Sequence, residues 1–395
     1  MNAKQHGRRR FLKKSAALAG LAAAAIPAVR GQTANAGRDL PYGERSRFVT
    51  SLRVDDGGDN ASFARSGNFL TPIQDSIGII TPSSLHFSSS HGSYPPDINP
   101  QEYRLMIHGM VDRPLSFTLE ELQRLPFVSR ILYIECNANR PGPENKTVAE
   151  SHGKTACSEW TGVPLSLLLK EAGVQSGASW IVAEGAESGK HTKSLPLAKA
   201  MHDCLVAYGQ NGEPVRPHQG YPMRLVAPGF PGYSHVKWLR RIKVVDQPYL
   251  TPSERFHFPQ GPKSVITFPS GEQRLPGRGF YMITGLAWSG GGAIRTVEVS
   301  TDNGQTWNQA QLHDPVLPIA HTRFSLTWNW QGEEAILQSR CTDELGQFQP
   351  TVAEFGEPKG VTPEGVLRRE AGGSHWPFVQ PWKVNRDGSV HNAIA

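Results

Sequence analysis

Tyr133-Ile134-Glu135-Cys136-Asn137-Ala138-Asn139-Arg140 takes the chain from a strand-like apolar run into a polar loop, with Cys136 at the junction. A thiolate at such a junction is a soft ligand, suited to a soft or borderline metal. A cysteine there is also commonly a small buried apolar residue, because free cysteine packs like a small hydrophobe. Other segments of the sequence are needed to distinguish a metal ligand from a buried apolar residue.

The segments nearest to this stretch mix helix and strand. Thr118-Leu119-Glu120-Glu121 predicts a capping box that opens a short helix before Pro126. Pro164 suits the first turn of a second helix, and Gly173 suits its C-cap. The apolar residues at helical spacing between them are Leu165, Leu168, Leu169 and Ala172. Apolar, β-branched runs at 130–134 and 180–182 predict strands, so we expect an α+β core rather than a regular alternation of strand and helix.

The sequence changes character from about Lys263 onward, where short alternating runs predict strands. In 294–300, Val297 and Val299 share a face and Ile294 is out of phase. Asp302-Asn303-Gly304 predicts a hairpin turn, because Asn-Gly tolerates positive φ. The later alternating positions are Phe324, Leu326, Trp328, Trp330, Ala335, Leu337, Ser339 and Cys341. We therefore expect an antiparallel sandwich, with a domain boundary between residues 250 and 275.

The N-terminus has the pattern of a secretory signal. Arg8-Arg9-Arg10-Phe11-Leu12-Lys13-Lys14 precedes an apolar run from Ala16 to Val29 and an Ala34-Asn35-Ala36 cleavage site. The paired arginines predict the twin-arginine (Tat) pathway, which exports proteins already folded around a cofactor, and hence a periplasmic location. The apolar run is shorter than the roughly 20 residues that span a bilayer, so no membrane span is expected. The alternative is a basic N-terminal tail.

Charge and cysteine content exclude several classes of protein. Residues 1–36 carry seven basic residues and no acidic one, so their removal lowers the net charge from +6 to −1. A basic surface for nucleic acid is therefore not expected. The four cysteines form no Cys-x-x-Cys motif, which argues against zinc-ribbon, iron–sulfur and c-type haem sites. A disulfide between Cys157 and Cys204 would be permitted in the periplasm, but the sequence leaves it open.

Two further segments bear on a cofactor. One is Leu85-His86-Phe87-Ser88-Ser89-Ser90-His91-Gly92, and the other is 220–241. The second places Arg224, His235 and Lys237 around a Pro-Gly turn, and these donors suit an anionic group such as a phosphate. The alternative is a set of solvated basic residues that flank a buried strand.

These motifs, in this order, resemble the sulfite oxidase family of molybdenum enzymes over nearly the whole mature chain, and within it most closely the SoxC-type molybdenum subunits of sulfane dehydrogenases. The segments that carry the resemblance are Glu135-Cys136, Ser158-Glu159-Trp160-Thr161-Gly162-Val163-Pro164-Leu165, Gly220-Tyr221-Pro222-Met223-Arg224-Leu225-Val226, Val236-Lys237-Trp238-Leu239-Arg240-Arg241, Gly285-Leu286-Ala287-Trp288-Ser289-Gly290, Val297-Glu298-Val299-Ser300-Thr301-Asp302 and Ala320-His321-Thr322-Arg323-Phe324.

The N-terminal pattern predicts a signal peptide over 1–36. The resemblance implies a mixed α/β molybdopterin-binding oxidoreductase domain over 37–262 and an Ig-like dimerisation domain with a C-terminal tail over 263–395. It implies that Cys136 is the ligand to molybdenum and the catalytic residue. The implied molybdopterin-binding residues are Phe87, Ser88, Ser89, Ser90, His91, Cys136, Glu187, Gln219, Arg224, His235, Val236 and Lys237.

The sequence departs from the family pattern near the metal. Ser89 stands where sulfite oxidases have a substrate-binding arginine, and Phe258 aligns with a tyrosine close to the metal. Gln219 falls at a usual histidine, and Asn137-Ala138-Asn139 replaces the common residues after the cysteine. Loss of a cation weakens the case for free sulfite, because a dianion needs charge-assisted hydrogen bonds. Either the substrate differs from sulfite, or Arg140 or Arg255 compensates.

The implied activity is oxidation of a sulfur substrate by oxygen-atom transfer, with electrons passing to a c-type cytochrome subunit. The substrate is expected to be sulfane sulfur on a sulfur-carrier protein, and the enzyme is expected to be a homodimer. The alternatives are a sulfite dehydrogenase, a reductase of similar fold, or a cofactor-free binding protein on the same scaffold.

Overall fold

A computed structural model describes residues 45–46, 48–56, 68–90, 94–250, 254, 256, 259–373 and 375–394. The chain divides into two units, residues 1–50 and residues 51–395, and the description below concerns the second unit. The expected signal peptide, 1–36, lies outside the described residues.

One sheet of the N-terminal half carries the Cys136 loop. Its strands are antiparallel and follow the order β10-β9-β6-β5, with β11 also paired to β9. They are β5 (Val128–Glu135), β6 (Thr155–Pro164), β9 (Leu205–Gln210), β10 (Glu213–Pro214) and β11 (Arg224–Val226). Glu135 pairs with Thr155 at the end of β5, so Cys136 leaves the sheet at its edge strand.

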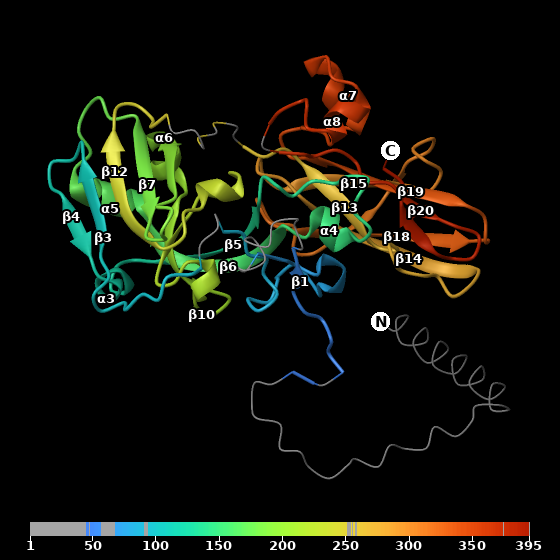
Figure 1. Ribbon diagram of the computed structural model, residues 1–395, viewed down its shortest axis with the longest axis horizontal. Helices are drawn as coiled ribbons and strands as arrows, with labels where there is room; N and C mark the ends of the chain where they lie inside the picture. The colour runs from blue at the N-terminus through green and yellow to red at the C-terminus, as the bar shows by residue number, and fades with distance from the viewer. Residues whose placement is uncertain are drawn as a thin grey trace, which may run out of the picture. The chain divides into compact units, whose positions relative to one another are not determined.

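A second sheet has the order β4-β3-β12-β7-β8. Its strands are β3 (Leu105–Gly109), β4 (Leu115–Phe117), β7 (Trp180–Gly185), β8 (Thr192–Pro196) and β12 (Leu239–Val245). Only β3 and β12 are parallel in it, so the α+β expectation is confirmed. Helices α5 (Leu165–Ala172) and α6 (Leu197–His202) lie beside this sheet (Figure 1).

The predicted helix signals act as expected. Helix α3 (Leu119–Gln123) begins at Thr118 with a full capping box, in which Thr118 and Glu121 satisfy each other's backbone N–H groups, and it ends before Pro126. Helix α5 ends at Gly173, whose φ of 71° is the left-handed conformation that glycine adopts easily. Its four predicted apolar residues are all fully buried.

The C-terminal half is a pair of sheets, with orders β13-β14-β18-β17 and β16-β15-β19-β20-β21. Their strands are β13 (Lys263–Phe268), β14 (Gly279–Trp288), β15 (Ile294–Ser300), β16 (Asn308–Gln309), β17 (Gln311–His313), β18 (Thr322–Trp330), β19 (Ala335–Asp343), β20 (Trp382–Val384) and β21 (Val390–Asn392). All pairs are antiparallel, which confirms the sandwich. Asn303 and Gly304 have φ values of 61° and 82°, as the predicted turn requires. The out-of-phase Ile294 coincides with a register shift between β15 and β19.

The remaining elements are short. They are β1 (Val54–Asp55), β2 (Phe69–Leu70), η1 (Ile73–Asp75), α4 (Val148–His152), η2 (Pro217–Gln219), η3 (Gly232–Ser234), α7 (Val352–Gly356), η4 (Glu357–Lys359) and α8 (Pro363–Leu367). After α8 the chain returns to the sandwich, where β20 pairs with β19.

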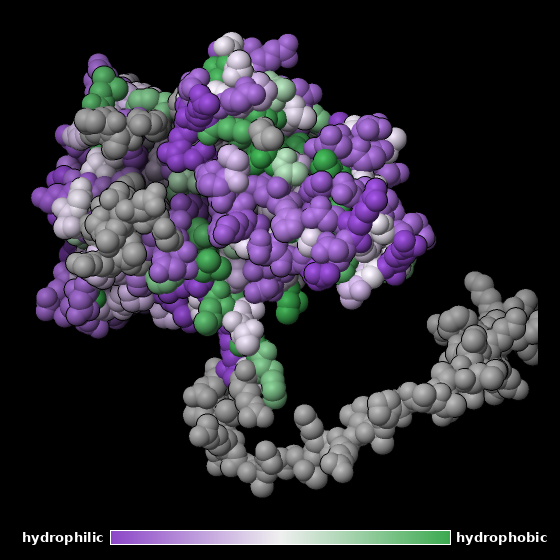
Figure 2. All heavy atoms as spheres, turned by 45° about the vertical axis from the view of Figure 1, so that its right-hand side comes forward, coloured by the Kyte–Doolittle hydropathy of each residue, from purple (hydrophilic) through white to green (hydrophobic). Residues whose placement is uncertain are grey.

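One apolar core joins the two halves. Tyr133 of β5 and Cys157 of β6 pack in the same cluster as Val265 and Trp288 of the sandwich. Hydrophilic side chains cover most of the face shown in Figure 2, and hydrophobic ones form small separate patches. Among the described residues, no helix is both long enough and apolar enough to cross a membrane.

Candidate active site around Cys136

A cavity beside Cys136 gathers residues that are far apart in the sequence. Its lining consists of His86, Phe87, Ser89, Ser90, Ile134, Cys136, Asn137, Glu187, His191, Gln219, Arg224, Gly232, Tyr233, His235, Lys237 and Trp238. Nine of the twelve residues predicted from the sequence are in this list, so the structure brings the predicted site together. Of the other three, Ser88 and Val236 do not line the cavity, and His91 lies outside the described residues.

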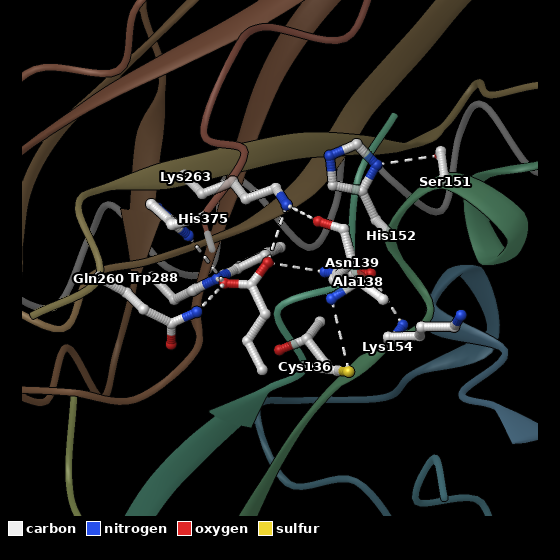
Figure 3. A network of polar contacts seen from close by, with 12 residues as sticks. Cys136, Ala138, Asn139, Ser151, His152, Lys154, Gln260, Lys263, Trp288 and His375 are labelled. Atoms are coloured by element: carbon white, nitrogen blue, oxygen red, sulfur yellow. Dashed lines mark hydrogen bonds and ion pairs between the residues drawn. The ribbon is translucent and has the colours of Figure 1, made fainter. Parts of the chain in front are cut away.

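The Cys136 loop is a tight turn that presents a partly exposed thiol. The Cys136 N–H donates to the Lys154 carbonyl at 2.9 Å, and the Asn139 N–H donates back to the Cys136 carbonyl at 3.0 Å. The Ala138 N–H points at Cys136 Sγ from 3.5 Å (Figure 3). The thiolate is the form of cysteine that binds metals, and this sulfur lies at the cavity.

Arg224 is the buried cation of the cavity. It begins β11, is 3% exposed, and stacks over the Trp160 ring at 4.9 Å. Its Nη groups donate to the Gln219 carbonyl and side chain and to the His235 carbonyl, at 3.0 to 3.3 Å. Burial lowers the pKa of its guanidinium to about 9. A buried guanidinium held only by neutral groups is a strong site for an anion.

Lys237 is the second cation. Its ammonium donates to the Ser89 carbonyl at 2.9 Å and to the His218 carbonyl at 3.2 Å. Burial, followed by the positive charge of Arg224, lowers the pKa of Lys237 to about 7. An anion bound between the two cations would reverse this effect.

His235 and Val236 were predicted to bind the cofactor, but in the structure both are engaged by other parts of the protein. The His235 Nδ1 accepts from the Ala227 N–H at 3.3 Å, so its Nε2 donates to the Phe230 carbonyl at 3.1 Å. Burial, then Arg224, lowers the pKa of His235 to about 3, so the ring is neutral and supports the loop. Val236 is fully buried in the apolar core, and its carbonyl accepts from the Leu225 N–H.

The segment 87–90 contributes another part of the cavity lining and is held by backbone and side-chain hydrogen bonds. Ser88 pairs with Phe69 through two backbone hydrogen bonds of 3.0 Å, and the Ser90 N–H donates to Asn68 Oδ1 at 2.8 Å. The carbonyl of Phe87 accepts from Gln219 Nε2 at 2.7 Å. Ser89 is left exposed, with its Oγ 3.9 Å from Cys136 Sγ.

Three buried polar atoms in the lining have no hydrogen-bond partner among the described residues. They are Arg224 Nε, His86 Nε2 and Glu187 Oε2. Burial raises the pKa of Glu187, although the His191 N–H donates to its other oxygen at 3.0 Å. Unsatisfied buried groups are costly, so the cavity is built for a polar ligand. A cation pair for a phosphate, polar atoms for a pterin and one thiol for a metal fit a molybdopterin group.

Sequence reasoning missed seven lining residues: His86, Ile134, Asn137, His191, Gly232, Tyr233 and Trp238. Six of them lie within the segments 85–92, 133–140 and 220–241 that the sequence analysis singled out, and proximity in the sequence was the signal that could have found them. His191 lies outside those segments; it enters through the turn after β7, and its Nε2 donates to the Tyr233 carbonyl at 2.9 Å.

The other three cysteines are not candidates for the metal. Cys157, Cys204 and Cys341 are buried free thiols, so the disulfide that the sequence left open is not formed. Burial raises the pKa of Cys157 to about 12, and it also raises the pKa values of Cys204 and Cys341. A thiol that resists ionisation is a poor ligand.

Comparison with known proteins agrees with this geometry. The family model described as "Oxidoreductase molybdopterin binding domain" matches residues 91–253, and the model described as "Mo-co oxidoreductase dimerisation domain" matches residues 261–356. The chain is therefore a molybdopterin-binding oxidoreductase, and its cofactor is molybdenum held by molybdopterin. The solved structure of the sulfane dehydrogenase SoxCD from Paracoccus pantotrophus is similar, with a TM-score of 0.82 and 36% identity over 91% of this chain and 95% of that chain. The chain belongs to the sulfite oxidase family of molybdenum enzymes.

Plant nitrate reductases are also related. The NADH nitrate reductase 2 of Phaseolus vulgaris is 32% identical over 76% of this chain and 39% of its own length. The NADH nitrate reductase 1 of Arabidopsis thaliana is 33% identical over 64% of this chain and 33% of its own length. The chain thus spans well under half of these relatives.

Proposed function

We propose that this chain is the molybdenum subunit of a periplasmic enzyme that oxidises sulfane sulfur bound to a carrier protein. Electrons would pass to a c-type cytochrome; its haem would be carried by another chain, because no Cys-x-x-Cys-His motif occurs in these 395 residues. When bound, the molybdenum–molybdopterin group supplies two-electron oxygen-atom transfer.

The chain's own residues have distinct proposed roles toward the cofactor. Cys136 is the protein ligand to molybdenum. Arg224 and Lys237 hold the anionic end of the molybdopterin, since both cations face the cavity and Arg224 can grip a phosphate bidentately. Glu187 and His86 offer the pterin their unpartnered polar atoms. His235, with both ring nitrogens occupied, positions the loop that carries Lys237.

Ser89 is the observation that carries the choice of substrate. The family resemblance places a substrate-binding arginine at this position, and the serine hydroxyl lies 3.9 Å from Cys136 Sγ. The side chain at residue 89 therefore faces the expected mouth of the metal site. A serine there provides no positive charge for a free dianion.

A neighbouring cleft supports the same choice. It has a volume of about 800 Å³ and shares Asn137 with the cofactor cavity, so the two meet at the Cys136 loop. Its lining includes four carboxylates and four cations: Asp55, Asp56, Glu144, Glu150, Arg140, Lys146, Lys154 and Arg369. Lys154 pairs with Asp56 at 2.8 Å, and Arg140 lies 3.6 Å from Glu144. A roomy cleft of balanced charge suits a peptide arm better than a small dianion.

The second candidate is a sulfite dehydrogenase, in which Arg140 of this cleft replaces the missing arginine. The relationship to nitrate reductases keeps a reductase as a further alternative. Purified exported protein should be analysed for molybdenum and pterin and then offered sulfite, nitrate and a sulfane-loaded carrier cysteine. Absence of metal and pterin would support a cofactor-free binding protein instead.

The sharper test is Ser89→Arg, with Ser89→Gln as a control of similar length and no charge. One charge-assisted hydrogen bond contributes roughly 1.5–3 kcal/mol, so the arginine should raise kcat/KM for sulfite about tenfold to a hundredfold. The same change should lower turnover of the loaded carrier. Efficient oxidation of sulfite by the wild type, with no activity on the carrier, would overturn the proposal in favour of a sulfite dehydrogenase.

A further inference from the structure

A buried polar network lies beside the Cys136 loop, and Figure 3 shows Lys263, Gln260 and Trp288 among its members. The Glu135 carboxylate is its centre. Glu135 is 1% exposed and accepts from Lys263 Nζ at 2.8 Å, Asn139 Nδ2 at 2.8 Å, Trp288 Nε1 at 2.9 Å and Gln260 Nε2 at 3.4 Å. His375 Nδ1 lies 3.8 Å from the same carboxylate. Burial alone would raise the pKa of Glu135, but the charges of Lys263 and His375 and the hydrogen bonds from Lys263 and Trp288 together outweigh burial, and the pKa is lowered.

Most partners of Glu135 come from the C-terminal half of the chain. Lys263 opens β13, Trp288 closes β14, and His375 belongs to the tail after α8. Glu135 itself ends β5, one residue before the thiol. The network thus connects the sandwich directly to the Cys136 loop.

Asn139 carries this connection into the loop. Its side chain donates to Glu135 Oε1 and accepts from the Lys154 N–H at 2.9 Å. Its carbonyl accepts from Lys263 Nζ at 2.6 Å, and its N–H closes the turn onto the Cys136 carbonyl. A displacement of Glu135 or Lys263 would therefore move the backbone of Cys136.

We propose that Glu135 and Lys263 are a positioning pair, which acts through Asn139 to hold the Cys136 thiolate in one orientation toward molybdenum. The pair makes the geometry of the metal ligand depend on the C-terminal domain. This inference rests on the proposed role of Cys136 as the ligand.

General energetics separate this role from plain stabilisation. Breaking one side of a buried ion pair leaves an uncompensated charge, whereas replacing both partners by neutral groups is often harmless to stability. A double neutral variant should therefore restore the fold without restoring the orientation of the turn. Such a variant isolates the positioning effect.

The experiment compares Lys263→Met, Glu135→Gln and the double variant Glu135→Gln/Lys263→Met with the wild-type holoenzyme and its apoprotein. Glu298→Gln is the control, because it breaks the Glu298–Arg340 pair of 2.9 Å within the sandwich. The readouts are the urea midpoint of unfolding, amide hydrogen exchange of the apoprotein, the Mo(V) electron paramagnetic resonance spectrum and the molybdenum midpoint potential.

We expect the single variants to lower the urea midpoint and the double variant to recover it. In the double variant, the amides of Cys136, Asn139 and Lys154 should lose about tenfold in protection, the effect of losing about one buried hydrogen bond. The Mo(V) spectrum and the potential should stay shifted, while Glu298→Gln leaves both unchanged. If the single variants do not accumulate as folded protein, the comparison of the double variant with the wild type tests the proposal by itself.

Recovery of the amide protection, spectrum and potential together with stability would show a merely structural pair and overturn the proposal. Failure of the proposed function would look different. In that case Cys136→Ser would leave the molybdenum signal intact, whatever the Glu135 and Lys263 variants do.

Discussion

Cys136 differs from the other cysteines in exposure and in surroundings. It is partly exposed at the cavity, and an N–H faces its sulfur, whereas the other three thiols are buried. We predict that Cys136→Ser lowers the turnover rate by a factor of about 100 or more, because a hard hydroxyl replaces a soft thiolate ligand. Steady-state kinetics and the electron paramagnetic resonance signal check this. Cys157→Ala and Cys204→Ala should keep the signal, and near wild-type turnover by Cys136→Ser would refute the ligand assignment.

Lys237 gives the site a predictable dependence on pH. Its lowered pKa of about 7 means that, above this pH, the free protein must take up a proton to present the ammonium to an anion. Anion affinity should therefore fall with rising pH above 7, by up to about tenfold per pH unit for one linked proton. Titration of the apoprotein with sulfate between pH 6 and 9 measures this. Lys237→Arg, which stays charged, should flatten the profile, and a flat profile for the wild type would contradict the prediction.

At the level of single residues, the sequence predicted the chemistry better than the packing. Arg224, Lys237 and Cys136 are identifiable because their side chains carry the charge or softness that the ligand needs. Val236 and His235 stood in the same motif, yet one is core and the other is engaged by backbone groups on both nitrogens. A motif does not reveal which neighbour a side chain faces, because that depends on strands distant in sequence.

Element η3 supports the Cys136 loop through a close approach of backbones. A Cβ at Gly232 would lie 2.8 Å from the Glu135 carbonyl oxygen and 3.1 Å from Cys136 Cα. Gly232→Ala should thus push η3 away, at a cost of about 1–3 kcal/mol for overpacking, and reduce molybdenum retention. Gly189→Ala is the matched control, since no atom lies within 4 Å of its added Cβ. Urea unfolding and metal content measure both effects, and equal behaviour of the two variants would show that the approach is unimportant.

Local signals predicted the elements whose ends are set by their own residues. The Thr118 capping box, the Gly173 C-cap and the Asn303-Gly304 turn are of this kind. The parallel pairing of β12 with β3 and the return of β20 to β19 were not foreseen. These pairings join strands separated by tens of residues or more, and the pattern of either strand is compatible with several partners.

At the scale of the whole chain, the proposal that the protein is exported rests on residues 1–36, which lie outside the described residues. Replacement of Arg8 and Arg9 by lysine keeps the charge but removes the twin-arginine motif. We expect the variant to remain in the cytoplasm, because lysine does not reproduce the hydrogen-bonding geometry of arginine. Cell fractionation should show a loss of periplasmic protein of about tenfold or more. Undiminished periplasmic yield would argue for another route.

Assembly is the second prediction at this scale. The dimerisation-domain match covers residues 261–356, and within it Phe280 and Met282 of β14 are 68% and 40% exposed. Exposed apolar residues on a sheet are typical of an interface, so we predict a homodimer that buries this part of β14. Light scattering at micromolar concentration should give twice the mass of the chain, and Phe280→Glu should shift the population toward monomer.

Phe127→Glu is the control for this variant, because Phe127 is 58% exposed but lies outside the matched domain. It should leave the dimer intact, since a new charge on a solvated surface opposes no contact between subunits. A monomeric wild type would contradict the dimer. A dimer that survives Phe280→Glu would instead place the interface on another face of the sandwich, because a buried, unpaired carboxylate at the contact is too costly to tolerate.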